Sequence, residues 1–113
     1  MTSKRFDEIV AELQQWQNST LPSKGGEYAT EDRLHNFKQI ANITGQTPMQ
    51  VCYTLMMKHI VALGDKIFNR EPMSQEFLNE KTGDPVNYLA LLRGLYEDEM
   101  IEKGLWNTEK EAK

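Results

Sequence analysis

The segment from Thr47 to about Asn69 constrains the fold of this chain more than any other part of the sequence. Thr47 is suited to cap a helix, Pro48 fits the first helical position, and Gln50 stands three residues after the cap, where it completes a capping box. The segment places apolar side chains around much of the helix circumference: Met49, Cys52, Leu55, Met56, Ile60, Leu63 and Ile67. A helix that is apolar on so many sides is expected near the centre of a fold.

Two amphipathic helices are expected before this segment. In residues 4–18 apolar side chains recur at helical spacing, as Phe6, Ile9, Val10, Leu13 and Trp16. Residues 19–26 collect Ser, Thr, Pro and two Gly, so the first helix should end near Asn18 and be followed by a mobile or ligand-facing loop. The second helix should begin with Thr30 as its cap and end at Gly45. Its apolar side would consist of Leu34, Phe37, Ile40 and Ala41.

The last part of the chain predicts two shorter helices. Ser74 should cap a segment over residues 75–81. Pro85 lacks a backbone donor and disfavours a helix interior, so the helix should either kink there or restart. Of the two we expect a restart, with Asp84 as the cap and Pro85 at the first helical position. This last helix should run to about Glu99 and pack centrally beside the segment that begins at Thr47.

Together these segments predict an all-α fold. We expect a single domain over residues 1–113, a compact bundle of four to five helices with its core at about 4–100 and a polar tail at 104–113. A chain of this length is able to bury one core, and no segment shows the alternation of a strand. The single cysteine, Cys52, excludes an intramolecular disulfide and a multi-cysteine zinc site.

Charge and hydropathy limit the partners. Thirteen basic and seventeen acidic side chains give a net charge of −4, which opposes sequence-independent binding to nucleic acid. The N-terminal segment is amphipathic, and no apolar stretch approaches the roughly 20 residues that span a bilayer. We therefore expect a cytoplasmic protein with no membrane partner and no nonspecific nucleic-acid binding.

Polar side chains stand among apolar neighbours in four places. These are Lys24 to Tyr28; Asp32, Arg33, His35 and Asn36; Lys58, His59 and Asp65; and Glu80, Asp84, Asn87 and Tyr88. Residues three, four or seven apart on one helix share a face, so these groups would converge inside a bundle. Carboxylates there would hold Mg²⁺, while Arg33 and Lys58 would contact phosphates. Asn87 would contact a base or ribose, and Tyr28 or Tyr88 would stack on a base.

Structural roles are open for the same residues. Asp32 suits the positive end of a helix dipole, and Asp84 before Pro85 suits a helix cap. His59 in an apolar helix suits a hydrogen-bonded core position, and Asn87 suits the satisfaction of buried backbone groups. Residue type and spacing alone leave both interpretations open.

Four segments resemble a set of small proteins common in bacteriophages. They read KGGEY at 24–28, DRLHNF at 32–37, MMKHIVALGD at 56–65 and EKTGDPVNYL at 80–89. That set is similar to the nucleotide modification associated helical families and, more distantly, to the MazG-like all-α NTP pyrophosphatases. In those enzymes acidic residues on two antiparallel helices bind Mg²⁺ and nucleotide phosphates are hydrolysed between them. The resemblance implies that Glu27, Glu31 or Asp32 stands for the first acidic motif and Glu80 with Asp84 for the second.

The chain departs from the enzyme pattern in both motifs. The family pairs carboxylates three residues apart, whereas Glu80 and Asp84 are four apart, and the other motif is rich in Arg33, His35 and Asn36. Our leading hypothesis is therefore a phage-encoded, oligomeric protein that binds a nucleotide or cyclic nucleotide immune signal without hydrolysing it, and so blunts a host defence. The nucleotide-binding residues would be Lys24, Tyr28, Arg33, His35, Asn36, Lys58, His59, Asp84, Asn87 and Tyr88.

Two alternatives belong to other functional classes. One is a MazG-like nucleoside triphosphate pyrophosphatase, in which Asp32, Glu80 and Asp84 would hold Mg²⁺; the binding protein would need no cofactor. The other is a protein-binding inhibitor of a host defence factor, which would be indifferent to nucleotides.

Overall fold

The computed structural model describes residues 1–26 and 34–106, with side chains for 1–21 and 34–106. The elements are α1 (Ser3–Gly26), α2 (His35–Thr44), α3 (Pro48–Phe68) and α4 (Gln75–Glu102). The described part of the chain contains these four helices and no strand, so the all-α prediction is confirmed. None of the described helices is long and apolar enough to span a membrane.

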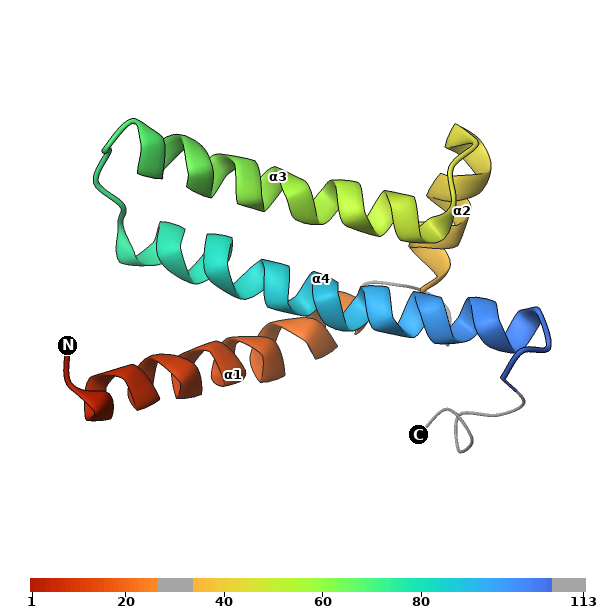
Figure 1. Cartoon of the computed structure of the whole chain (residues 1–113). Helices are drawn as coiled ribbons and strands as arrows, with labels where there is room; N and C mark the ends of the chain where they lie inside the picture. The colour runs from red at the N-terminus through yellow and green to blue at the C-terminus, as the bar shows by residue number, and fades with distance from the viewer. Residues whose placement is uncertain (27–33, 107–113) are drawn as a thin grey trace.

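The helix α4 lies between two other helices. It packs antiparallel along α3 on one side and crosses α1 on the other, while α2 packs against α3 (Figure 1). Within the described residues α1 does not contact α3. The predicted central position of the last helix is therefore observed, whereas α3, also expected near the centre, is covered by α4 and α2 and leaves a long face open.

The buried core lies where α2, α3 and α4 meet. Its buried apolar residues are Phe37, Ala41, Val51, Cys52 and Leu95. Partly buried side chains surround them, namely Leu34, Met49, Leu55, Tyr88, Leu91 and Leu92. The core therefore sits toward the first half of α3 and the second half of α4, and the remaining length of these helices is covered on fewer sides.

Local capping signals set the helix ends where the sequence predicted them. Thr47 Oγ1 accepts a hydrogen bond from the Gln50 amide at 3.1 Å, and Gln50 Oε1 accepts one from the Thr47 amide at 2.9 Å, which completes the capping box. Ser74 Oγ accepts from the Phe77 amide at 3.1 Å at the start of α4. Gly45 ends α2 with a left-handed φ of 71°. These three boundaries are confirmed.

The predicted loop at 19–26 is wrong, because α1 continues to Gly26. The hydroxyls of Ser19 and Thr20 donate to the carbonyl oxygen of Trp16 at 3.2 and 2.6 Å, within the same helix. Ser and Thr therefore satisfy their hydroxyls on the preceding turn and do not end the helix here. The predicted Thr30 cap of the second helix lies outside the described residues; the described helix begins at His35.

The predicted restart at Pro85 is also wrong, because α4 runs through it without a break. Proline inside a helix costs about 3 kcal/mol or more. That cost is offset by tertiary packing, since Gly83, Asp84 and Pro85 are all buried. A Cβ added to Gly83 would lie 2.6 Å from Trp16 Nε1, so the missing side chain is what lets α1 approach α4.

The chain is more elongated than the compact bundle that the sequence predicted. Its radius of gyration is 16.5 Å and its extents are 47 × 32 × 26 Å. A compact domain of roughly 100 residues has a radius of gyration of about 13 Å. The polar tail predicted at 104–113 is described only to Trp106, whose ring packs edge-on against Tyr96 at 5.6 Å.

Candidate functional site

Two buried polar residues, Asp84 and Asn87, mark the crossing of α1 and α4. Their exposed fractions are 6% and 1%, and they stand one helical turn apart on α4. Buried polar groups need partners because an unsatisfied one costs about 1–3 kcal/mol. The contacts of these two residues therefore define the site.

The carboxylate of Asp84 contacts both neighbouring helices. Trp16 Nε1 on α1 donates a hydrogen bond to Asp84 Oδ1 at 3.0 Å. His59 Nε2 on α3 lies 3.8 Å from Asp84 Oδ2. Because Asp84 is inside a continuous helix and its oxygens face these side chains, the interpretation of Asp84 as a helix cap is wrong.

The amide of Asn87 extends this polar network toward α1. Its Nδ2 donates to Thr20 Oγ1 at 2.7 Å, and that hydroxyl in turn donates to the Trp16 carbonyl. The other atom of the amide, Oδ1, is buried and has no hydrogen-bond donor among the described residues. One acceptor at the site is thus left without a described partner.

Three side chains on α3 and α4 have the spacing of a metal site. One ligand atom each from His59, Glu80 and Asp84 lies within 4.8 Å of the others. Ligand atoms about 2.0–2.3 Å from a shared ion lie at most about 4.6 Å apart, so the three side chains would move slightly closer together on binding an ion. A set of one imidazole and two carboxylates suits a divalent ion such as Mn²⁺ or Zn²⁺, and its oxygens also suit Mg²⁺.

The three candidate ligands differ in their surroundings. His59 and Asp84 are largely buried, whereas Glu80 is exposed and lies 3.1 Å from Lys81 Nζ. The ring of Tyr88 packs against that of His59 at a centroid distance of 5.6 Å and a tilt of 42°. The Tyr88 ring therefore packs against the His59 imidazole, and the site is exposed to solvent on the side of Glu80.

The structure brings together part of the predicted set and leaves the rest elsewhere. His59, Glu80, Asp84, Asn87 and Tyr88 lie in this cluster. No hydrogen bond or ion pair among the described residues joins the cluster to His35, Asn36 or Lys58, and the last two are exposed. The remaining predictions lie outside the described residues or side chains: Lys24, Glu27, Tyr28, Glu31, Asp32 and Arg33.

Sequence reasoning missed Trp16 and Thr20. Trp16 was assigned to an apolar stripe and Thr20 to a loop, and their partners Asp84 and Asn87 are 68 and 67 residues away. Gly83, beside a candidate acidic residue, is a weak signal that another helix approaches closely, but the glycine alone does not identify that helix.

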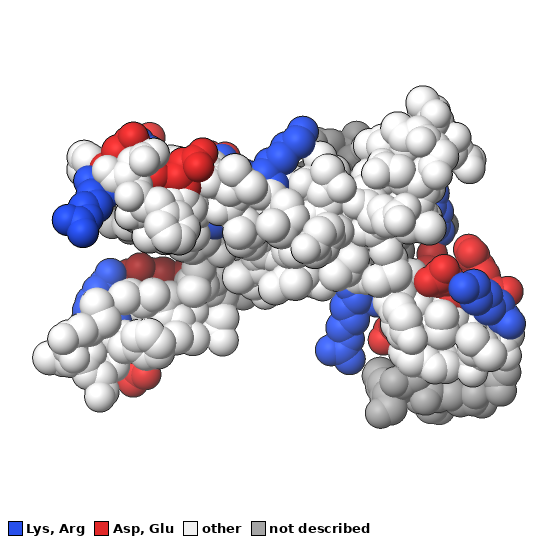
Figure 2. All heavy atoms as spheres, turned by 45° about the horizontal axis from the view of Figure 1, so that its top comes forward, with Lys and Arg blue, Asp and Glu red and all other residues white. Residues whose placement is uncertain are grey.

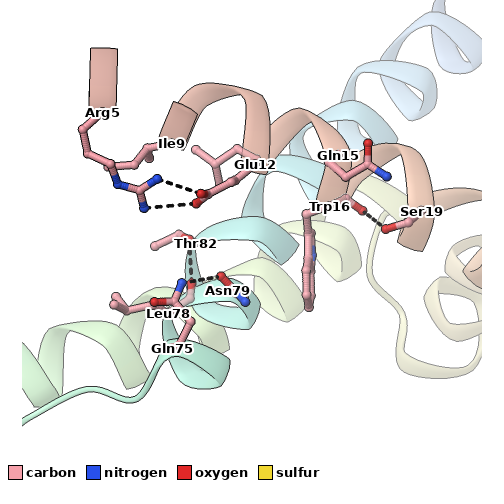
Figure 3. Close-up of a pocket in the computed structure, with 11 residues that line it drawn as sticks. Arg5, Ile9, Glu12, Gln15, Trp16, Ser19, Gln75, Leu78, Asn79 and Thr82 are labelled. Atoms are coloured by element: carbon pink, nitrogen blue, oxygen red, sulfur yellow. Dashed lines mark hydrogen bonds and ion pairs between the residues drawn. The ribbon is translucent and has the colours of Figure 1, made fainter. Parts of the chain in front are cut away.

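A cleft lies between α1 and α4 (Figure 3), and its lining includes Trp16, the hydrogen-bond partner of Asp84. It has a volume of about 460 Å³. Arg5 and Glu12 form an ion pair of 2.8 Å within its lining, Gln75 and Asn79 offer amide groups, and Trp16 belongs to both the cleft and the Asp84 network.

The arrangement therefore combines three side chains that could hold a cation, a buried amide acceptor one turn away and a cleft that shares Trp16 with them. The candidate ligand atoms are one nitrogen and two carboxylate oxygens, and the site is partly exposed to solvent. Comparisons of this chain with protein-family models, with curated proteins and with solved structures find no match.

Proposed function

We propose that this chain binds the phosphate groups of a nucleotide through a divalent cation held by His59, Glu80 and Asp84. The observation that carries the proposal is the convergence of these three ligand atoms to within 4.8 Å of one another. His59 lies on α3, and Glu80 and Asp84 lie on α4, so two helices that the fold holds antiparallel supply the ligands.

Phosphate is the ligand class that suits such a site. Three protein ligands leave coordination positions of the ion open, and hard divalent ions fill them with water and phosphate oxygens. Two carboxylates balance the charge of one divalent ion, so the remaining phosphate charge would have to be met by cationic side chains. Arg33 was predicted for this role and Lys24 as a further nucleotide-binding residue; both lie outside the described side chains and stay predictions. Lys58 is exposed and makes no described contact with the three ligands.

The cleft supports a nucleotide over a free phosphate. Its volume accommodates a base and sugar, and it is lined by amides and by the indole of Trp16. Trp16 also bonds to Asp84, so a ligand in the cleft would be one side chain away from the carboxylate. Asn79 and Gln75 would read the polar edges of the base or ribose, a role that the sequence had assigned to Asn87.

Two outcomes follow from binding, and each has a supporting observation. Hydrolysis to a monophosphate and pyrophosphate is favoured by the open edge at Glu80, where the ion would polarise a phosphate and activate water. Sequestration without hydrolysis is favoured by the commitment of one Asp84 oxygen to Trp16, which leaves fewer carboxylate oxygens for a metal. A host-protein inhibitor has no such observation and stays a prediction.

The test is a thermal-shift titration with Mn²⁺, Mg²⁺ and a panel of nucleoside triphosphates and cyclic nucleotides, followed by chromatography of the recovered ligand. Binding to the folded state raises its melting temperature. Glu80→Gln should reduce the shift, and Glu76→Gln, the same change one turn earlier on α4, should not. Equal ligand-induced shifts in melting temperature for the two variants would contradict the proposed site. Intact recovered ligand would indicate sequestration, and cleaved ligand would indicate hydrolysis.

A further inference from the structure

One face of α3 carries a run of apolar side chains. Five of its residues follow at steps of four, three, four and three positions, which is the heptad spacing of paired helices. They are Tyr53, Met57, Ile60, Gly64 and Ile67. Val61 and Phe68 flank this stripe, and their side chains are exposed, Phe68 by 88%. We call these seven residues the α3 stripe.

An exposed stripe of this kind is unusual for a chain that folds alone. Large apolar patches on soluble proteins mark interaction surfaces. The described core holds few buried apolar residues, and Tyr53 and Val61 remain 54% and 56% exposed. In Figure 2, where this side of the molecule comes forward, most of the surface along α3 carries no charged side chain.

Gly64 lies in the middle of the α3 stripe and leaves room for a partner. A Cβ placed on it would find no atom within 4 Å. Glycine inside a helix costs about 1 kcal/mol relative to alanine, and no packing contact within the described chain accounts for it here. A second helix is able to approach most closely where the facing residue is small.

Two charged residues beside the α3 stripe indicate that the second helix is another copy of α3. Lys58 and Asp65 are exposed, stand seven residues apart, and lie on the same flank of α3. No ion pair among the described residues involves either side chain. If a second α3 runs antiparallel, the same flanks meet, so Lys58 of each copy would lie opposite Asp65 of the other.

In the same two-fold arrangement the small residue Gly64 faces a large apolar residue. With its axis near the level of Ala62, Ile60 of one copy would face Gly64 of the other, and Met57 would face Ile67. Charge and shape thus select the same antiparallel register. We propose that the α3 stripe is a self-association surface through which two copies of this chain form a two-fold symmetric dimer.

The dimer surface is separate from the proposed metal site. His59 points toward Asp84 on α4, and none of the seven residues of the α3 stripe belongs to the candidate metal site. Loss of the dimer therefore need not remove the metal-binding side chains. A failure of this inference would leave the proposed function standing, and the reverse also holds.

Sedimentation velocity on the full chain tests the dimer. The mass derived from sedimentation of the wild type should be twice the chain mass of 13.1 kDa. Gly64→Arg, whose Cβ would have no neighbouring atom within 4 Å, should give a folded monomer by circular dichroism. A wild-type monomer at high micromolar concentration, or a Gly64→Arg dimer, would overturn the proposal.

A charge-swap cycle tests the register. Lys58→Glu should raise the dissociation constant of the dimer roughly tenfold, because it places like charges opposite one another twice. Adding Asp65→Lys should restore the affinity, whereas Lys4→Glu, a matched change on α1, should have no effect. If the double variant stays as weak as Lys58→Glu, the antiparallel register is wrong.

Discussion

Trp16 Nε1 donates a hydrogen bond to Asp84 Oδ1 at 3.0 Å and so joins two residues that stand 68 positions apart. The indole lies against Gly83, whose missing side chain allows the approach. This contact fixes α1 on α4 at the place where the candidate ligand Asp84 is buried. The stability of the fold and the geometry of the site therefore depend on the same crossing.

Trp16→Phe should destabilise the fold by about 1–3 kcal/mol, since it leaves a buried carboxylate oxygen without its indole donor. The measurement is the free energy of unfolding from urea denaturation followed by circular dichroism. Trp106→Phe is the matched control, because its ring contact with Tyr96 survives in a phenyl ring. Equal losses in the two variants would mean that the indole bond adds nothing beyond aromatic burial.

Gly83→Ala should destabilise the chain even though alanine favours a helix over glycine by about 1 kcal/mol. The added Cβ would overlap the Trp16 ring, and a rigid indole held by Asp84 has little room to move. Gly94→Ala on the same helix meets only Leu34 at 3.8 Å and should be neutral or stabilising. Melting temperatures of the two variants give the comparison, and a stable Gly83→Ala chain would contradict the close approach.

His59→Ala should weaken Mn²⁺ binding more than Mg²⁺ binding, because imidazole nitrogen is a better ligand for Mn²⁺ than for Mg²⁺. Isothermal titration of each ion into both proteins measures the change. We expect a loss of roughly tenfold or more for Mn²⁺ on removal of one of three ligands. His35→Ala on α2, outside the cluster, should leave both affinities unchanged. An equal loss for both ions would argue that His59 is not a ligand.

The thiol of Cys52 should be unreactive in the folded protein. The residue is 1% exposed, and burial raises the pKa of Cys52 from 9.0 to about 11. At neutral pH the thiolate fraction is then very small. Alkylation by iodoacetamide should be slow in buffer and fast in denaturant, and mass spectrometry of the time course distinguishes the two. Fast labelling under native conditions would show that the core around Cys52 opens readily.

The same pKa shift predicts a dependence of stability on alkaline pH. The folded state keeps the Cys52 proton more tightly than the unfolded state, so this contribution is fully present below about pH 9 and is lost as the pH rises toward 11. Denaturation of wild type and Cys52→Ala between pH 8 and 11 isolates the effect, because other groups titrate in both proteins. As the pH rises, the free energy of unfolding of the wild type should fall relative to that of Cys52→Ala.

Several parts of the fold follow from short-range signals in the sequence. The capping box at Thr47, the cap at Ser74 and the left-handed glycine at Gly45 each act within one helical turn, so a reader of the sequence can place them. The polar residues His59 and Asp84 could also be selected as candidates, because charged groups inside apolar segments are costly unless they have partners.

Helix continuity and the identity of the partners required the tertiary structure. Pro85 lies inside α4, and the Ser-rich segment after Trp16 lies inside α1, because packing between helices outweighs the local preference to end. The sequence by itself determined the helical class, the capped ends and the pool of polar candidates, since these depend on neighbours along the chain. Only the tertiary structure decided that α1 meets α4 at Gly83, because burial free energy depends on which distant surfaces come into contact.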